Sequence, residues 1–433
     1  MASVTATRLT LTEYATEPHV ALDDGVADWL RVAVPELDVR PSWNAPGHYD
    51  LTPGSHIGLV SISGLSIVIR PKVPVERVLF LISYALDPVR WQANATDYAG
   101  ADDLTEGMAA IFGHTLKRAL RRGLLHGYRS HEAALMTVRG QLRFEDQLRA
   151  RFDAPIPIEV TFDDFTADTD LNRLLYAALS VLRRLPLRST SLRSTLAACA
   201  SAFADTVTAM RLHPSNLPTL TWNRLNSHFR PAAELAAAIL RSVSTELDHG
   251  VTRGTALTIN MNVVFETFLR TALRQALSLD ASAWPDRTPS WLALDLASRV
   301  KLEPDLTWWE VDQCRFVGDA KYKRINAAGV KHADLYQLLA YATALEVEGG
   351  MLIYAAGEAK DVDHEVRSSG KRLRVRALDI DGPPSAVLDR VAALGHEIRE
   401  LATPRGRPEH ASTLTQGGTR DPGVLPATGC PTS

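Results

Sequence analysis

The first hundred residues are dominated by alternating apolar and polar positions. Residues 60–63 and 65–69 alternate with period two around a glycine, which predicts a β-hairpin. Pro71 ends the second strand, because proline cannot donate a hydrogen bond to a strand ladder. The apolar run at 75–86 then predicts a short helix. We expect residues 1–100 to form a β-rich N-terminal domain.

After residue 100 the apolar spacing changes to every third or fourth position, which predicts helices. Only residues 132–144 read as extended, with an interruption at Arg139 and Gly140. We therefore expect residues 101–253 to be mainly α-helical. The predicted helices cover residues 104–123, 171–185, 192–212 and 231–247.

The predicted secondary-structure elements change their order from residue 254 onward, where a helix precedes three strands, a second helix and a further strand. This order is typical of an α/β layer arrangement over residues 254–402. Residues 403–433 are rich in Pro, Gly, Ser and Thr, and we expect a disordered tail. The predicted helices lie at 259–277 and 331–346, and the strands at 298–302, 306–310, 315–321 and 351–355.

The 433-residue chain is nearly balanced in charge, which bears on whether it binds nucleic acid. Lys and Arg total 47 against 50 Asp and Glu, a net charge of −3. This argues against a stand-alone nucleic-acid binder, so DNA contacts would come from local basic patches or from a partner. Cys199, Cys314 and Cys430 are too far apart to indicate a zinc site or a disulfide framework. We find no signal peptide and no long apolar run, and expect a cytoplasmic protein that does not enter a membrane.

Carboxylates and a lysine gather in the predicted C-terminal strands. Asp305, which follows a proline, lies between two strands, and Asp319-Ala320-Lys321 ends the next. Carboxylate oxygens are the ligands that Mg²⁺ prefers, so Asp305 and Asp319 can share one cation. Period two places Lys321 on the same face as Asp319, where it can orient the attacking water, while Ala320 points into the core. The backbone carbonyl of Ala320 is a further candidate metal ligand.

The helices on either side add candidate residues to this site. Glu266 lies in the preceding helix and can direct a third carboxylate toward the cation. Gln337 and Tyr341 are four residues apart in the following helix and so share a face, with Asp334 one turn earlier. They are candidates for holding the phosphate or a base of the substrate. Each of these residues also has a plainer explanation, such as a turn at Pro-Asp, a charged surface strand or a solvated helix face. Their combination in one unit favours a metal-dependent nuclease.

Three stretches of the chain resemble the McrC family, the nuclease subunit of the McrBC 5-methylcytosine restriction system. Residues 67–73 look like its I-x-P-K segment, and residues 166–179 are similar to its D-x-N-R helix entry. Asp305 to Lys321 resembles the PD-(D/E)xK nuclease core, and the Gln337-x-x-x-Tyr341 pattern is shared with RecB-like nucleases. The expected fold class is therefore multidomain α+β, with a β-rich N-terminal domain, an α-helical middle and a C-terminal α/β PD-(D/E)xK nuclease domain.

The resemblance implies a partner and a division of labour. The partner would be McrB, an AAA+ GTPase hexamer that recognises modified DNA, and GTP would be used by that subunit. The N-terminal region would dock on the hexamer and stimulate GTP hydrolysis, and residues from about 255 would cut double-stranded DNA with Mg²⁺. The chain contains no G-x-x-x-x-G-K-[ST] motif of its own, in agreement with this division.

Two other functions compete with this interpretation. A RecB-like repair exonuclease would carry the same core, although the four cysteines that hold an iron–sulfur cluster in some of these proteins are missing here. A non-catalytic assembly adaptor of an AAA+ motor is the second alternative. The complete set of two aspartates and a lysine argues against an inactive nuclease.

Overall fold

The structure is a computed structural model of the whole chain. It describes residues 7–62, 64–89, 103–150, 156–185, 187–244, 254–322, 332–355 and 361–403. The tail expected at 403–433 lies outside the described residues except for Thr403. The described residues form a mixed α+β protein with several sheets and helices, as expected.

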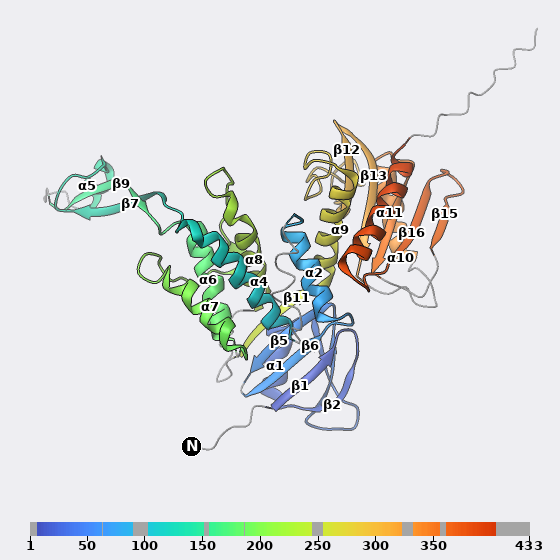
Figure 1. Cartoon of the computed structure of the whole chain (residues 1–433), viewed down its shortest axis with the longest axis horizontal. Coiled ribbons are helices and arrows are strands. Elements are labelled where there is room, and N and C mark those ends of the chain that lie inside the picture. The colour runs from blue at the N-terminus through green and yellow to red at the C-terminus, as the bar shows by residue number, and fades with distance from the viewer. Residues whose placement is uncertain are drawn as a thin grey trace, which may run out of the picture.

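A five-stranded sheet with the order β1-β6-β5-β11-β10 forms the centre of the N-terminal part (Figure 1). The predicted hairpin is confirmed by the antiparallel pairing of β5 with β6. Helix α1 (Asp24–Ala33) and a smaller sheet of β2 (Glu17–Ala21), β4 (His48–Pro53) and β3 (Leu37–Pro41) complete this part. The strands of the large sheet are β1 (Thr7–Thr12), β5 (His56–Ile62), β6 (Leu65–Arg70), β10 (Val243–Ser244) and β11 (Gly254–Asn260).

Strand β11 corrects the expected domain boundary at residue 254. All seven of its residues pair with β5, from Gly254 opposite Ile62 to Asn260 opposite His56. This segment therefore belongs to the N-terminal sheet and not to the C-terminal unit. Pairing across about 200 residues leaves no signal in the local apolar pattern, so the sequence alone did not reveal it.

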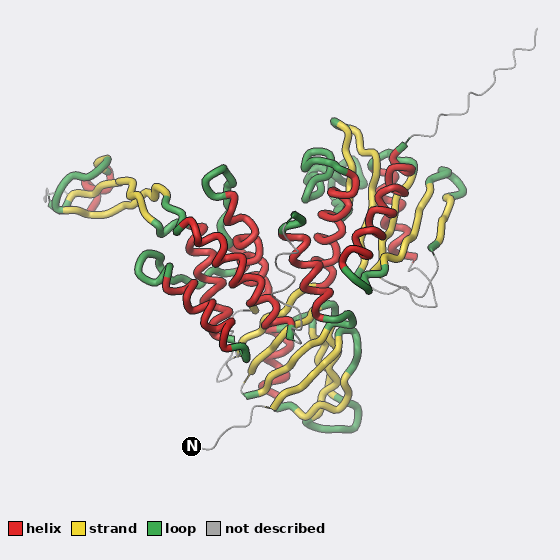
Figure 2. The backbone as a smooth tube through the Cα atoms, viewed as in Figure 1, coloured by secondary structure: helices red, strands yellow, loops and turns green. Residues whose placement is uncertain are grey.

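Helices form a bundle between this sheet and a projecting arm (Figures 1 and 2). The prediction for 192–212 is wrong at its C-terminal end, because α7 stops at Ser201. The backbone N–H and the hydroxyl of Thr208 instead donate to the Asp168 carboxylate at 3.0 and 2.8 Å, which turns the chain out of the helical path. The helix expected at 231–247 likewise ends at Ser242. The bundle contains α4 (Leu104–Ala119), α6 (Asp170–Arg184), α7 (Thr190–Ser201) and α8 (Arg230–Ser242), and α2 (Val75–Leu86) packs against α4.

Two polar residues at the start of α6 hold the bundle together. The buried Asn172 amide donates to the carbonyls of Leu125 and Ala167 at 2.9 and 2.7 Å. Arg173 forms an ion pair with Asp168. These two residues of the D-x-N-R segment thus have structural contacts that account for their presence.

The arm is an antiparallel ribbon that extends from the bundle (Figure 1). Its main strands are β7 (Gly127–Leu135) and β9 (Ile158–Thr166), which pair along their whole length. The extended segment expected at 132–144 is correct only in part, since the strand starts at Gly127 and a short β8 (Gln141–Leu142) leads into α5 (Phe144–Ala150).

The C-terminal unit is a five-stranded sheet with the order β12-β13-β14-β16-β15. Helices α9 and α11 contact one face and α10 the other. Phe316 and Ile353 join the core on the α9 side, whereas Val317 and Leu352 pack with α10. The elements are β12 (Leu306–Glu310), β13 (Gln313–Lys321), β14 (Gly349–Ala355), β15 (Val362–Glu365), β16 (Arg372–Leu378), α9 (Met261–Leu277), α10 (His332–Ala344) and α11 (Pro384–Ala402).

The strand expected at 298–302 is wrong. This segment makes only an isolated bridge between Ala293 and Lys301. The Asp295 carboxylate accepts the backbone N–H groups of Arg299 and Val300 at 2.9 and 2.8 Å, which closes a turn in place of a strand. Among the residues that the structure describes, no helix is long and apolar enough to cross a membrane.

Candidate active site

Asp305 and Asp319 are brought together by the first two strands of the C-terminal sheet. Asp305 directly precedes β12, and Asp319 lies near the end of β13. The antiparallel register places Leu306 opposite Gly318, so the two aspartates occupy adjacent positions at one end of this pair. The backbone N–H of Ala320 donates to Asp305 Oδ2 at 2.8 Å, which fixes the side chain across the two strands.

Lys321 shares the face of Asp319, as period two predicts. Its Nζ forms an ion pair with Asp319 Oδ2. Ala320, between them, is buried in the core cluster on the opposite face. The predicted alternation is therefore confirmed, while the role of the Ala320 carbonyl as a metal ligand stays a prediction.

Helix α10 presents Gln337 and Tyr341 to the same face of the sheet. Lys321 Nζ donates to Gln337 Oε1 at 3.2 Å, and Gln337 Nε2 donates to the Tyr341 hydroxyl at 2.8 Å. The Tyr341 hydroxyl in turn donates to the Glu303 carbonyl at 3.3 Å. These contacts form one chain of hydrogen bonds that gives the lysine ammonium group a second partner besides Asp319. Asp334, one turn earlier, accepts the Tyr354 hydroxyl at 2.6 Å.

Glu266 lies on α9, on the other side of Asp305. It forms an ion pair with Arg270, and Arg270 Nε donates to the Asp305 carbonyl at 3.1 Å. Its carboxylate is close enough to add negative charge to the surroundings of Asp305. The structure thus brings all the candidate residues to one end of the sheet, with Glu266 tied to a neighbouring arginine.

Burial and charge change the proton affinities of this cluster. Burial, followed by the charges of Asp319 and Glu266, raises the pKa of Asp305 to about 8. Burial alone would lower the pKa of Lys321, but the carboxylates of Asp319, Asp305 and Asp334 together raise it. Burial also raises the pKa of Tyr341, and the two aspartates add to the effect. The site therefore holds a cationic lysine, a neutral phenol and an Asp305 carboxyl whose charged form is disfavoured.

This donor set fits a cation that keeps most of its water. Among the described residues, no group of three or more His, Cys, Asp and Glu side chains is gathered closely enough to hold a metal ion. Asp305 and Asp319 supply two carboxylates, and burial together with the charge of Asp319 raises the pKa of Asp305. Mg²⁺ is usually bound through one or two carboxylates with several waters retained. The residues present therefore fit Mg²⁺ better than a metal enclosed by protein ligands.

The sequence of this chain was compared with models of known protein families. The profile of the family described as "McrBC 5-methylcytosine restriction system component" matches residues 51–355, which is well over half of the chain. The chain belongs to the McrBC family. The match covers the N-terminal sheet from β5 onward, the bundle, the arm and the C-terminal sheet as far as β14.

A solved structure from Thermococcus gammatolerans agrees with the McrBC assignment at the level of fold. It is a half-complex from a tetradecameric assembly of McrB AAA+ hexamers with bound McrC, and a chain of it is 18% identical with a TM-score of 0.53. The similarity covers 90% of this chain and 100% of that chain. A chain of the McrBC complex from the same organism is 19% identical with a TM-score of 0.41, over 63% of this chain and 88% of that chain. No curated protein matches the sequence.

In this McrBC chain, the end of β13 contacts the N-terminal part, and no pattern in the sequence predicts this contact. Tyr322 directly follows Lys321, and its hydroxyl donates to Oε1 of the fully buried Glu13 at 3.0 Å. The backbone N–H of Lys72 donates to the same oxygen at 2.6 Å, and the Tyr14 hydroxyl donates to the Tyr322 carbonyl at 3.4 Å. The N-terminal sheet thus holds the end of β13, across 309 residues of sequence.

Proposed function

We propose that this McrBC-family chain is the Mg²⁺-dependent endodeoxyribonuclease subunit of a modification-dependent restriction complex, with an active site of the PD-(D/E)xK type. The observation that carries the proposal is the junction of β12 and β13, where Asp305, Asp319 and Lys321 meet. Pro304-Asp305 and Asp319-Ala320-Lys321 supply the two halves of the motif in the order it requires.

Each residue takes a separate role in this proposal. Asp305 and Asp319 would hold the cation, with the Ala320 carbonyl as a further ligand and Glu266 as a nearby carboxylate. When bound, Mg²⁺ neutralises phosphate charge and lowers the pKa of a coordinated water. Lys321 stays protonated, because Asp319 raises its pKa, and it stabilises negative charge that develops on the phosphate.

Gln337 and Tyr341 act on the lysine and on the substrate side of the site. Their hydrogen-bond chain fixes the Lys321 ammonium group, so that it does not have to reorganise during the reaction. The Tyr341 phenol is a neutral donor near pH 7, and burial moves its pKa further above the ordinary tyrosine value. Both side chains carry donors that suit phosphate oxygens.

The partner in this proposal is a McrB-like AAA+ GTPase hexamer. Family membership and the fold shared with a structure of McrB hexamers with bound McrC support it. The sequence has no phosphate-binding loop, so GTP would be hydrolysed by the partner and double-stranded DNA would be read there. The net charge of −3 agrees with a chain that does not bind DNA strongly by itself.

The proposal is tested with covalently closed circular DNA and with a linear duplex whose ends are blocked. With the partner, GTP and Mg²⁺ present, we expect both substrates to be cut internally, and we expect EDTA to abolish cutting. The chain alone should hydrolyse no GTP and give little specific cleavage. Degradation confined to free DNA ends would indicate the RecB-like exonuclease. Partner stimulation without any cutting would indicate the assembly adaptor.

A further inference from the structure

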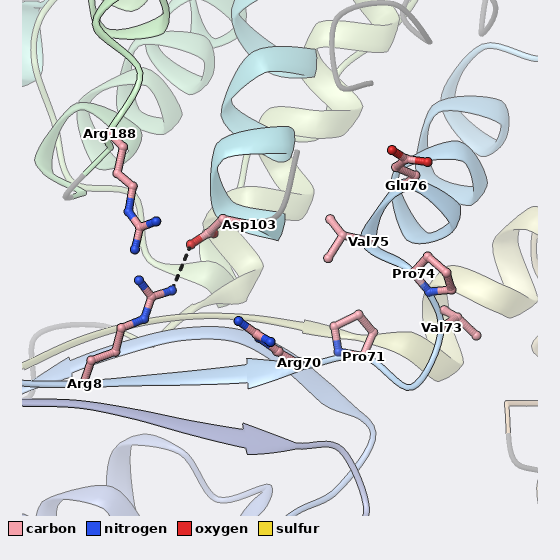
Figure 3. A pocket seen from close by; sticks show the side chains of 9 residues that line it. All are labelled: Arg8, Arg70, Pro71, Val73, Pro74, Val75, Glu76, Asp103 and Arg188. Atoms are coloured by element: carbon pink, nitrogen blue, oxygen red, sulfur yellow. Dashed lines mark ion pairs between the residues drawn. The ribbon is translucent and has the colours of Figure 1, made fainter. Parts of the chain in front are cut away.

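A cleft of about 710 Å³ lies between the N-terminal sheet and the helix bundle (Figure 3). None of its lining residues belongs to the C-terminal sheet or to the candidate active site. Three arginines from separate elements line it, namely Arg8 of β1, Arg70 of β6 and Arg188 of the segment between α6 and α7. Figure 3 shows their guanidinium groups directed into the same space.

The strand register places two of these arginines on one face of the sheet. Strands β1 and β6 are parallel, with Arg8 opposite Ser66 and Thr12 opposite Arg70. Ser66 and Arg70 are four residues apart on one strand, so they share a face, and Arg8 shares it with them. Leu11 and Ile69 are buried on the other face. The two guanidinium groups therefore rise from the sheet toward the bundle.

Arg188 approaches from the bundle on a fixed backbone. The carboxylate of Glu106, on α4, accepts the backbone N–H of Arg188 and also that of Ser189, the latter at 3.2 Å. Ser189 then caps α7 by accepting the N–H of Leu192 at 3.3 Å. The start of the Arg188 side chain is thus held in place before any ligand arrives, which lowers the entropy cost of binding.

Positive charge in the cleft is only partly neutralised. Asp103 pairs with Arg8 at 3.8 Å, and it also accepts the N–H of Thr105 at 2.9 Å as the N-cap of α4. Within the part of the chain that the structure describes, no carboxylate forms an ion pair with the side chain of Arg70 or Arg188. Glu76 lines the cleft but is turned away from the arginines in Figure 3. Two guanidinium groups are therefore available to an anion.

We propose that this cleft binds backbone phosphates of a nucleic-acid strand, as a second DNA contact outside the active site. Guanidinium groups match phosphate oxygens with paired N–H donors. The lining contains no aromatic ring on which a base or a nucleotide could stack, while Pro71 and Val75 offer an apolar wall to the carbon atoms of a sugar. These features favour a sequence-independent backbone contact over a free nucleotide. The anion site rests on the cleft alone, whereas nucleic acid as its ligand rests on the proposed function.

The test measures binding of a fluorescent DNA duplex to the full-length chain by anisotropy over a series of salt concentrations. EDTA is present, so nuclease activity plays no part and an inactive nuclease leaves the result unaffected. The salt slope is the slope of the logarithm of the binding constant against the logarithm of the salt concentration, and each neutralised phosphate contributes about 0.9 to its magnitude. In a triple variant with Arg8, Arg70 and Arg188 each changed to Gln, we expect this magnitude to fall by about two. Arg188→Gln alone should lower it by about one.

The matched control changes the exposed residues Arg183, Arg193 and Arg224 to Gln, which removes the same charge outside the cleft. We expect its salt slope to equal that of the wild type. Equal slopes for the control, Arg188→Gln and the wild type would overturn the proposal. It would also be overturned if Arg188→Gln abolished calorimetric binding of guanosine diphosphate but left duplex binding unchanged. The arginines would then serve a free nucleotide. Loss of partner binding with an unchanged DNA slope would assign them to a protein interface and equally contradict the proposal.

Discussion

At the scale of single residues, Asp168 shows how one carboxylate organises several segments. It accepts hydrogen bonds from Arg129 at 3.0 Å, from Arg173 and from Thr208, and so joins the base of the arm, α6 and the segment after α7. The hydrogen bonds from Arg173 lower the pKa of Asp168 well below its usual range, and those from Thr208 add to the effect. The charged form is therefore the one that the fold stabilises.

We predict that Asp168→Asn lowers the free energy of unfolding by about 1.5–3 kcal/mol, the usual range for hydrogen bonds to a charged group. Urea unfolding at pH 7 measures it, with the exposed neighbour Asp170→Asn as the control. Because the folded pKa is depressed, this stabilisation is present above the unfolded pKa of about 3.9 and is lost as the pH falls toward the folded value. The difference between wild type and variant should thus shrink below about pH 4. If the difference in unfolding free energy stayed constant below this pH, the stabilisation would not come from the charge of Asp168.

At the scale of elements, the end of β13 is held from two directions. Helix α10 contacts it through Gln337 and Lys321, and the N-terminal sheet contacts it through Glu13 and Tyr322. The second contact leaves a buried carboxylate dependent on the Tyr322 hydroxyl for one of its hydrogen bonds. Removal of a donor from a fully buried polar group costs more than removal of a hydrogen bond at the surface.

We predict that Tyr322→Phe lowers the free energy of unfolding by about 1.5–3 kcal/mol. Tyr14→Phe is the matched control, because its hydroxyl contacts neutral groups, the Tyr322 carbonyl at 3.4 Å and the Ser55 side chain, and we expect it to cost less than about 1 kcal/mol. Chemical unfolding of the full chain measures both variants. If the two substitutions cost the same, Glu13 does not depend on Tyr322 and the contact between the two parts is weaker than the structure indicates.

The elements that the sequence predicted are those set by interactions between residues close together in the chain. The alternation in Asp319-Ala320-Lys321 and the four-residue spacing of Gln337 and Tyr341 are set by backbone geometry, so the sequence predicted which side chains share a face. Strand β15, strand β16 and helix α11 were not predicted, although they complete the sheet and cover it. The pairing of β11 with β5 and the contact of Tyr322 with Glu13 join residues about 200 and 309 positions apart. Such contacts are decided by tertiary packing, which leaves no local periodicity.

At the scale of the whole molecule, the strand β11 joins the two ends of the chain. It lies between β5 and β10 in the N-terminal sheet and leads directly into α9 of the C-terminal unit. Helix α9 also packs against α2, where Phe80, Tyr84 and Phe268 form a cluster with ring centroids 5.6–5.9 Å apart. Partner binding and DNA cleavage, if they belong to different ends of the chain, are therefore linked through a shared core.

We predict that a chain truncated after residue 253 does not fold stably. The truncation removes β11, so β5 loses its partner along seven residues and the α2 cluster loses Phe268. Thermal unfolding followed by circular dichroism compares this chain with the full-length protein, and we expect no cooperative transition. A cooperative transition near that of the full-length protein would show that the N-terminal part is an independent domain. The boundary at residue 254 would then be correct after all.

The measurement that tests the central claim most directly is cleavage of closed circular DNA by the full-length Asp319→Asn protein, with the partner, GTP and Mg²⁺ present. We predict a loss of at least about a hundredfold in cleavage rate, because one of two carboxylates for the cation is removed. Stimulation of the partner's GTP hydrolysis should be unchanged, which shows that the variant is folded and assembled. Asp312→Asn, an exposed aspartate in the turn between β12 and β13, should cut at the wild-type rate. Cleavage by Asp319→Asn at the wild-type rate would place the nuclease site elsewhere and contradict the account.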